Sequence, residues 1–139
     1  MRLARQFSQA SKILVVGGGQ IGKAVAIGLK TNGYTDITVA DPNPTNQAIL
    51  EKNDIKFVSD AKGLGENCEV LFTALPKPEH VRFVMETSGL LEELEAGSIW
   101  IDHTSTDPNE ATRLAHKATD LGIKIVEAPL TGGLQERVE

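Results

Sequence analysis

The sequence is poor in cysteine and aromatic residues and has no long apolar run. Its 139 residues contain one cysteine, Cys68, so no disulfide can form within the chain. A lone free thiol is typical of a reducing compartment, and we expect a cytoplasmic protein. No segment approaches the roughly 18 consecutive apolar residues that a membrane-spanning helix needs. We therefore expect a soluble chain without a membrane partner.

Basic surface is also scarce. The formal net charge is −5, and acidic and basic residues are interspersed along the chain. Nucleic-acid-binding proteins carry a basic stripe or patch, and none is present in this pattern. We expect no nucleic-acid partner, and a small molecule is the more natural ligand for a single domain of this length.

The strongest positive signal is a glycine-rich segment near the amino terminus. An apolar run at residues 13–16 leads directly into Gly17-x-Gly19-x-x-Gly22. Apolar residues, beginning with Ile21, then recur at helical spacing. Strand, glycines and helix in this order predict a loop that binds the pyrophosphate of a dinucleotide at a helix amino terminus. The alternative is a glycine-rich turn between strand and helix that binds no ligand.

Each glycine has a distinct expected role in such a loop. Gly17 permits the tight turn, Gly19 lets the backbone approach the phosphates, and Gly22 lets the helix pack closely on the strand. These roles follow from the absence of a Cβ atom at each position. The prediction can therefore be tested by the space around each glycine.

An acidic residue follows the second apolar run. Residues 37–40 predict a strand, and Asp41 stands at its end, 19 residues beyond Gly22. This is the position from which a carboxylate binds ribose hydroxyls. The same carboxylate would repel a 2′-phosphate, and no arginine occurs at residues 42–45. The pattern predicts NAD as the cofactor, with NADP less favoured.

The remaining chain alternates short apolar runs with amphipathic stretches. Further strands are predicted at 55–58, 70–74, 98–102 and 123–126, and helices at 45–52, from 78 onward, at 90–94 and at 107–121, with a weak helical turn at 60–66. This alternation predicts an α/β fold of the Rossmann type. We expect a doubly wound, mainly parallel six-stranded sheet in the order 3-2-1-4-5-6, with helices on both faces in three layers.

Three segments give the chain a family resemblance. The segment Gly97-Ser-Ile-Trp-Ile-Asp-His-Thr-Ser-Thr-Asp-Pro108 precedes Glu127-Ala-Pro-Leu-Thr-Gly-Gly133, and Leu75-Pro76 with Val81 lies upstream. Together with the glycine loop they resemble the β-hydroxyacid dehydrogenases, the group containing 3-hydroxyisobutyrate dehydrogenase, tartronate semialdehyde reductase and 6-phosphogluconate dehydrogenase. In that family the last segment typically reads close to "DAPVSGG".

The resemblance implies roles for individual residues. Leu75 and Pro76 would line the nicotinamide side of the cofactor, and Ser105 would hydrogen-bond to it. His80 stands where the family often has a polar cofactor contact, although an exposed helix histidine is an alternative reading. The full expected cofactor set is Gly17, Gly19, Gln20, Ile21, Gly22, Asp41, Pro42, Leu75, Pro76, His80 and Ser105. The expected substrate-binding residues are Thr131, Gly132 and Gly133, for which a plain turn is the alternative.

The resemblance also implies that part of the enzyme is missing. The family handles the substrate proton with a lysine on a second, all-helical domain, and no lysine here matches that motif. We therefore expect an arm at 1–11, a dinucleotide-binding domain at 12–133 and a tail at 134–139, with no catalytic residue and no metal site. The arm could be a transit-peptide remnant, but we favour a frayed or packed segment.

Two functional hypotheses follow. The first is the NAD-binding domain of an oxidoreductase that transfers hydride between nicotinamide and a small 3-hydroxy acid, inactive alone. The second is a stand-alone nucleotide-binding or regulatory module. A third alternative is another reductase of the same fold, such as an imine or pyrroline-carboxylate reductase. An exposed apolar patch near the chain's end could support a homodimer.

Overall fold

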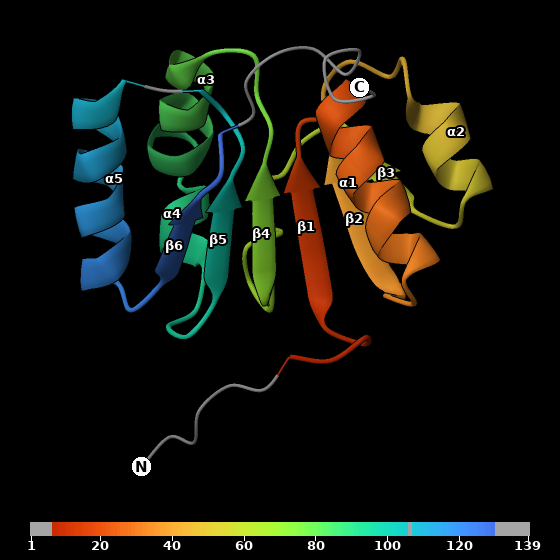
Figure 1. Cartoon of the computed structure of the whole chain (residues 1–139), viewed down its shortest axis with the longest axis horizontal. Coiled ribbons are helices and arrows are strands. Elements are labelled where there is room, and N and C mark those ends of the chain that lie inside the picture. The colour runs from red at the N-terminus through yellow and green to blue at the C-terminus, as the bar shows by residue number, and fades with distance from the viewer. Residues whose placement is uncertain (1–6, 106, 130–139) are drawn as a thin grey trace, which may run out of the picture.

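A six-stranded, wholly parallel sheet forms the centre of the computed structural model, which describes residues 7–105 and 107–129. The strand order is β3-β2-β1-β4-β5-β6, as Figure 1 shows. Their bounds are β1 (Lys12–Val16), β2 (Asp36–Ala40), β3 (Lys56–Val58), β4 (Val70–Thr73), β5 (Ile99–Asp102) and β6 (Lys124–Glu127). The predicted doubly wound order and the parallel pairing are confirmed.

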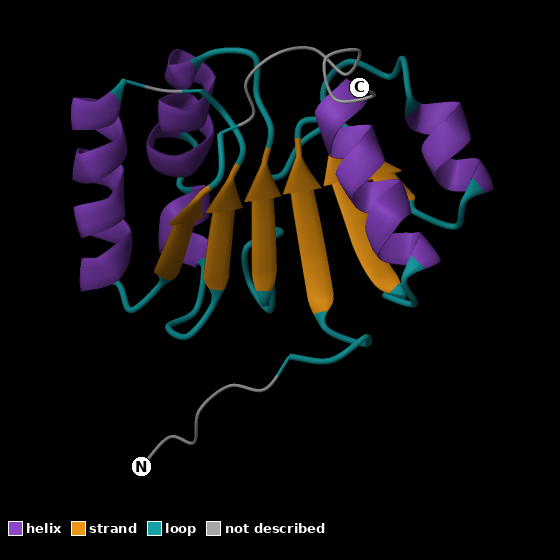
Figure 2. Ribbon diagram, in the orientation of Figure 1, coloured by secondary structure: helices purple, strands orange, loops and turns teal. Residues whose placement is uncertain are grey.

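Helices lie on both faces of this sheet (Figure 2). They are α1 (Gln20–Thr31), α2 (Gln47–Lys52), α3 (Pro78–Arg82), the π-helix η1 (Phe83–Thr87), α4 (Leu90–Glu93) and α5 (Pro108–Asp120). The helices α1 and α2 pack on one face, and the later helices contribute to the core on the other. The predicted three-layer α/β architecture is therefore confirmed.

Side chains of β1 show how one strand serves two cores. Ile13 and Val15 belong to the apolar cluster under α1 and α2, whereas Leu14 and Val16 belong to the cluster under α3, α4 and α5. All four are buried. Because successive side chains of a strand point to opposite faces, a strand covered on both sides has to be apolar throughout. The run at residues 13–16 is continuous for this reason.

Two helix boundaries follow the local sequence. Helix α1 ends before Gly33, whose φ of +95° is a left-handed conformation that suits glycine. Helix α5 begins with Pro108, and the Asp107 side chain accepts the backbone N–H of Glu110 at 3.1 Å. The start of α5 agrees with the helix predicted at 107–121.

Three segments show contacts that the sequence pattern did not predict. The helix from Pro78 widens into a π turn at Phe83–Thr87, where the N–H of Ser88 donates to the carbonyl of Phe83. Residues 60–66, predicted as a weak helical turn, contain a hydrogen-bonded turn, and two of their backbone N–H groups donate to the Glu93 carboxylate. The described part of the arm is a turn in which Gln9 bonds to the segment after α1. The spacing of apolar residues in one segment cannot predict hydrogen bonds to residues in another segment.

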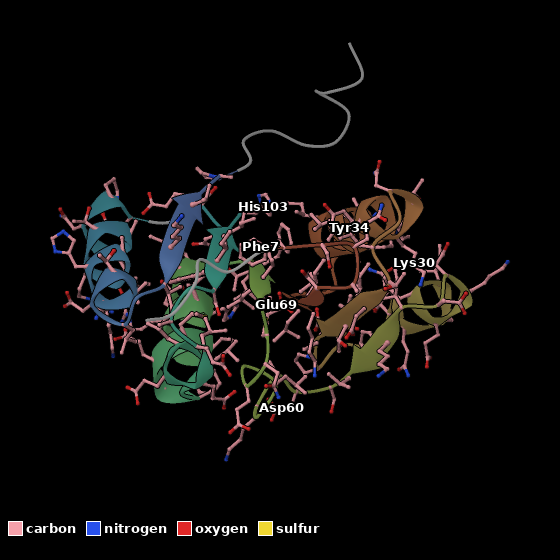
Figure 3. The ribbon with its side chains drawn as sticks, turned by 90° about the horizontal axis from the view of Figure 1, so that it is seen from below. Phe7, Lys30, Tyr34, Asp60, Glu69 and His103 are labelled. Carbon is pink, nitrogen blue, oxygen red and sulfur yellow. The ribbon has the colours of Figure 1, made fainter. Side chains whose placement is uncertain are left out.

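One half of a sheet face has no helix over it within the described residues. Side chains of β5 and β6 on the α1 side include Ile99 and Ile101, which are half-buried, and Val126, which is 49% exposed. Viewed along the strands, α1 covers the other half of this face, and His103 lies at the open half (Figure 3). The sheet thus presents an apolar strip at its β6 edge. No helix in the described part of the chain is long and apolar enough to cross a membrane.

Candidate cofactor-binding site

A cavity of about 990 Å³ lies at the carboxyl ends of the strands. Loops that follow β1, β2, β3 and β4 line it, as expected at the switch point of a doubly wound sheet. Nine residues of the predicted cofactor set are among its walls: Gly17, Gly19, Gln20, Ile21, Asp41, Pro42, Leu75, Pro76 and His80. Residues from distant parts of the chain therefore meet around one space.

Two of the loop glycines are required by close backbone packing. A Cβ atom on Gly17 would lie 2.2 Å from the carbonyl oxygen of Ala74, and the φ of Gly17 is +106°. A Cβ atom on Gly22 would lie 1.7 Å from the carbonyl oxygen of Gly17. Gly22 lies under the loop instead of lining the cavity, and it lets α1 approach β1. Any side chain at either position would displace backbone atoms.

Gly19 is in a different environment. It is exposed, it lines the cavity, and a Cβ atom there would meet nothing within 4 Å. The open space at Gly19 belongs to the cavity and adjoins the amino terminus of α1, which begins at Gln20. Unpaired N–H groups and the positive end of the helix dipole make this a favourable place for a phosphate.

The Asp41 carboxylate holds the glycine loop. Its Oδ2 atom accepts the N–H of Gly18 at 2.6 Å, and its Oδ1 atom accepts the N–H of Asn43 at 2.8 Å. From the other side, the Asn46 side-chain amide donates to the carbonyl of Gly18 at 2.7 Å. The carboxylate is therefore oriented before any ligand arrives. Each oxygen retains lone-pair capacity for a further donor such as a ribose hydroxyl.

The opposite end of the cavity is formed by the segments after β4 and β5. The N–H of Leu75 donates to the hydroxyl of Thr104 at 3.0 Å, which joins the two segments. His103 also lines the cavity; its ring stacks on Phe72 with centroids 5.9 Å apart, and its Nδ1 lies 2.9 Å from the carbonyl oxygen of Ala128. These contacts hold the His103 ring in place on the open face.

Not every predicted site residue reaches the main cavity. Ser105 is exposed and lines a second cavity of about 310 Å³, together with Asp102 and Glu127. The predicted substrate residues Thr131, Gly132 and Gly133 lie outside the described residues. His116 is exposed on α5 and reaches neither cavity.

Several cavity residues were missed from the sequence. The turn after β3 contributes residues 59–62, and η1 contributes Phe83 and Val84. Phe83 is 59% exposed although it is aromatic, an exposure that no local pattern reveals. Asn46, which supports Gly18, also went unnoticed. It lies at the start of the helix predicted at 45–52, and asparagine is a common residue just before a helix, a weak signal that could have drawn attention to it.

A set of ion pairs braces the helices behind the site. Glu86 of η1 accepts Arg113 through both guanidinium terminal nitrogens and Lys117 at 3.0 Å. Hydrogen bonding to Arg113 is the main cause that lowers the pKa of Glu86 to about 2. Glu110 pairs with Arg82 and Arg113, and the bond to Arg113 lowers its pKa as well. These pairs join α3 and η1 to α5, and none of their residues lines the cavity.

The single thiol, Cys68, is buried. Burial raises the pKa of the Cys68 thiol to about 11, so it is neutral and a poor nucleophile at ordinary pH. Within the described residues, no group of three histidine, cysteine or acidic side chains could hold a metal ion. The main cavity instead combines backbone donors, one oriented carboxylate and apolar walls, which suit a dinucleotide.

Comparison with models of protein families shows to which family the chain belongs. The NAD-binding domain of 6-phosphogluconate dehydrogenase matches residues 12–138 of the sequence. The chain belongs to this family. The glycine loop and Asp41 are thus found in an NAD(P)-binding domain, as the fold and the cavity independently indicate.

Individual relatives of this NAD-binding domain are dehydrogenases. The 2-(hydroxymethyl)glutarate dehydrogenase of Eubacterium barkeri is 30% identical over 123 residues, which is 88% of this chain and 40% of the relative. Human mitochondrial 3-hydroxyisobutyrate dehydrogenase is 24% identical and covers 94% of this chain and 39% of its own length. The chain thus spans about two fifths of the curated relatives that it matches.

Solved structures show the same fold. A 3-hydroxyisobutyrate dehydrogenase from Salmonella typhimurium superposes with a TM-score of 0.80 at 23% identity, covering 88% of this chain and 42% of that one. An imine reductase variant from Myxococcus stipitatus in complex with NAD⁺ gives 0.73 at 19% identity, covering 85% and 39%. At these identities the likeness concerns the fold alone.

Proposed function

We propose that this NAD-binding domain binds NAD in preference to NADP and serves an enzyme that oxidises a small 3-hydroxy acid. The observation that carries the cofactor proposal is the Asp41 carboxylate, which is held at the cavity by the N–H groups of Gly18 and Asn43. A carboxylate fixed in this way can accept both hydroxyls of the adenosine ribose.

The shape of the cavity supports one orientation of the cofactor. The adenosine ribose would lie at Asp41, and the pyrophosphate would pass over the open side of Gly19 at the start of α1. The nicotinamide end would then reach the turn at Leu75 and Pro76, which lines the far side of the cavity. This path runs from β2 across β1 to β4, the usual direction across a switch point.

Electrostatics support the preference for NAD. The 2′-phosphate of NADP would bring negative charge to the Asp41 carboxylate, and like charges at such range repel. Residues 42–45 offer no arginine to balance it. Lys62 lines the cavity, but Asp60 lines it as well, so the charges of this turn offset each other.

The proposed reaction follows from the chemistry of the cofactor and the relatives. A hydride leaves the carbinol carbon of the hydroxy acid for NAD⁺, the hydroxyl proton passes to a base, and the products are a carbonyl acid and NADH. Two relatives carry names of hydroxyacid dehydrogenases, and the segment at Thr131–Gly133 resembles a carboxylate-binding segment of that family.

A titration tests the cofactor proposal. NADH added to the 139-residue chain should quench the fluorescence of Trp100, the only tryptophan, with a micromolar or weaker dissociation constant. NADPH should bind more weakly. Equal affinity for the two would contradict the NAD preference, and no quenching or heat of binding with either would contradict the site itself.

Turnover assays separate the enzymatic hypothesis from the module. We expect the chain alone to bind NADH but not to reduce tartronate semialdehyde or oxidise 3-hydroxyisobutyrate, because the family's acid–base lysine has no counterpart in its sequence. Measurable turnover would show that a residue of this chain serves as the acid or base. Binding of NADH that no hydroxyacid or imine influences would favour the stand-alone regulatory module.

A further inference from the structure

Three buried polar side chains, none with a role predicted from the sequence, lie at the carboxyl ends of β4 and β5. Thr73, Asp102 and Thr104 are 0%, 5% and 4% exposed. Burying hydroxyl and carboxylate groups costs free energy unless each is hydrogen-bonded, so a buried cluster needs a complete set of partners. Their partners form a single connected path toward the cavity.

The path begins at Trp100 and ends at the carboxylate of Asp102. The indole N–H of Trp100 donates to the Thr73 hydroxyl oxygen at 2.9 Å. The hydroxyl of Thr73 in turn donates to Oδ1 of Asp102 at 2.8 Å. The same Oδ1 atom accepts the backbone N–H of Thr104 at 2.9 Å. Each donor has one defined acceptor, which fixes the rotamers of Thr73 and Asp102 and the backbone of Thr104.

Thr104 connects this hydrogen-bonded path to Leu75, which lines the cavity. Its hydroxyl oxygen accepts the backbone N–H of Leu75 at 3.0 Å. The last main-chain bond from this strand to β1 is made one residue earlier, where the N–H of Ala74 donates to the carbonyl of Val16. Pro76 has no N–H to donate. The Thr104 hydroxyl therefore holds the turn at the point where the sheet no longer does.

The segment that carries Thr104 is itself rigid. The N–H of His103 donates to the carbonyl of Thr73 at 2.8 Å, and the N–H of Ala128 donates to the carbonyl of Asp102 at 2.8 Å. The His103 ring is also stacked on Phe72. Three neighbouring strand ends are thereby joined, so a change at Thr104 acts on Leu75 and not on the whole segment.

We propose that Thr104 is a positioning residue for the nicotinamide end of the cofactor. It holds the Leu75–Pro76 turn against the cavity through its hydroxyl, and Asp102 holds Thr104. This inference rests on the proposed function, since it assumes that the nicotinamide lies at this turn. The Thr104 hydroxyl acts through Leu75 and is not assigned a contact with the cofactor.

The experiment compares two ligands that share everything except nicotinamide. Thr104→Val keeps the shape of the side chain but removes the acceptor, so the Leu75 N–H loses its partner. Thr104→Ser retains the hydroxyl. We expect Thr104→Val to weaken NADH binding about three- to tenfold, as the loss of one buried hydrogen bond allows, and to leave ADP-ribose binding unchanged. Thr104→Ser should restore NADH binding.

A matched control separates positioning from general destabilisation. Ser98 is fully buried at the opposite end of β5, and its hydroxyl donates to the carbonyl of Cys68 at 3.1 Å. Ser98→Ala also removes one buried hydrogen bond from a hydroxyl to the backbone, but at the amino-terminal end of β5, away from the cavity. It should lower stability without changing the ratio of NADH to ADP-ribose affinity. Amide hydrogen exchange should accelerate at Leu75 in Thr104→Val and not in Ser98→Ala.

The outcomes distinguish the two proposals. Equal weakening of NADH and ADP-ribose by Thr104→Val, or no weakening of either, would overturn the positioning role while the cofactor site stands. An unaltered chain that binds ADP-ribose and NADH equally would show that nicotinamide makes no contact and would also overturn it. An unaltered chain that binds neither ligand would refute the proposed function, and the positioning role would be refuted with it.

Discussion

The Asp41 carboxylate and the backbone of Gly18 are joined by a hydrogen bond of 2.6 Å between residues 23 positions apart in the sequence. The acid at the end of β2 and the glycine loop after β1 therefore form one unit. Asp41 is expected both to bind the ribose and to hold the loop on which the pyrophosphate would lie. Substitutions at this residue should consequently affect cofactor choice and cofactor affinity together.

Two substitutions of Asp41 should separate these effects. Asp41→Ala removes the charge and the acceptor for Gly18, and we expect about ten- to hundredfold weaker NADH binding, the range for hydrogen bonds to a charged group. Asp41→Asn retains an oxygen that can accept the Gly18 N–H and should weaken NADH binding less. In calorimetric titrations, both variants should show a smaller difference between the affinities for NADH and NADPH than the unaltered chain does. An unchanged NADH-to-NADPH ratio in both variants would contradict the repulsion argument.

Two exposed glycines of the same region provide a matched test of the loop. Neither Gly19 nor Gly28 has an atom within 4 Å of an added Cβ, but only Gly19 lines the cavity. Gly19→Ala should change the free energy of unfolding by less than about 0.5 kcal/mol, because its φ of −73° suits alanine. It should still weaken NADH binding about tenfold or more by obstructing the pyrophosphate.

The control is Gly28→Ala, in the interior of α1. It should raise the free energy of unfolding by about 0.5–1 kcal/mol, since alanine is the better helix former, and leave NADH binding unchanged. Urea unfolding and NADH titration of both variants make the comparison. If Gly19→Ala bound NADH as well as Gly28→Ala does, no pyrophosphate would pass over Gly19.

Stability should fall in acid partly because of Glu86. Hydrogen bonding to Arg113 lowers the pKa of Glu86 from 4.5 to about 2 in the folded chain. A carboxylate with a lowered folded pKa stabilises the fold above its unfolded pKa, and this contribution is lost as the pH falls toward the folded pKa. The relevant window therefore runs from about pH 4.5 down to about pH 2. Arg113 is 46% exposed, so solvent screening keeps the contribution small, within about 1 kcal/mol.

Unfolding in urea at a series of pH values checks this prediction. Glu86→Gln should be less stable than the unaltered chain near neutral pH, and the difference should shrink as the pH falls through this window. Glu79→Gln, which changes an exposed glutamate on α3, serves as the control. If the free energies of unfolding of Glu86→Gln and the unaltered chain differed by the same amount at all pH values, the carboxylate charge of Glu86 would not contribute to stability.

The uncovered half of the sheet should promote self-association. Ile99, Ile101 and Val126 form an apolar strip that no helix covers among the described residues, and such strips favour contact with a second copy. We expect sedimentation coefficients that rise with protein concentration and a shift toward monomer in Val126→Lys. Leu121→Lys places the same charge on a 40% exposed residue at the end of α5 and should have no such effect. A clean monomer at high concentration of the unaltered chain would contradict the expectation.

Local sequence was sufficient for most of the architecture because the relevant signals are short-range. The stop at Gly33 and the cap at Asp107 reflect forces that act within a few residues. The apolar run at 13–16 is a short pattern in the sequence that marks a strand buried on both faces. The sequence did not predict the π turn at Phe83–Thr87 or the hydrogen bonds from residues 63 and 65 to Glu93. The bonds to Glu93 depend on a neighbour from another segment.

The division is clearest in the site itself. Strand, glycines, helix and acid occur in a fixed order along the chain. This order, together with the family resemblance that supplied Leu75, Pro76 and His80, predicted nine of the residues that line the cavity. Only the tertiary structure decided that Ser105 lines a separate cavity and that Thr104 supports Leu75. The physical reason is that a hydrogen bond between residues 29 positions apart depends on which strands become neighbours. Long-range packing determines which strands become neighbours, and the spacing of residues along the sequence does not predict it.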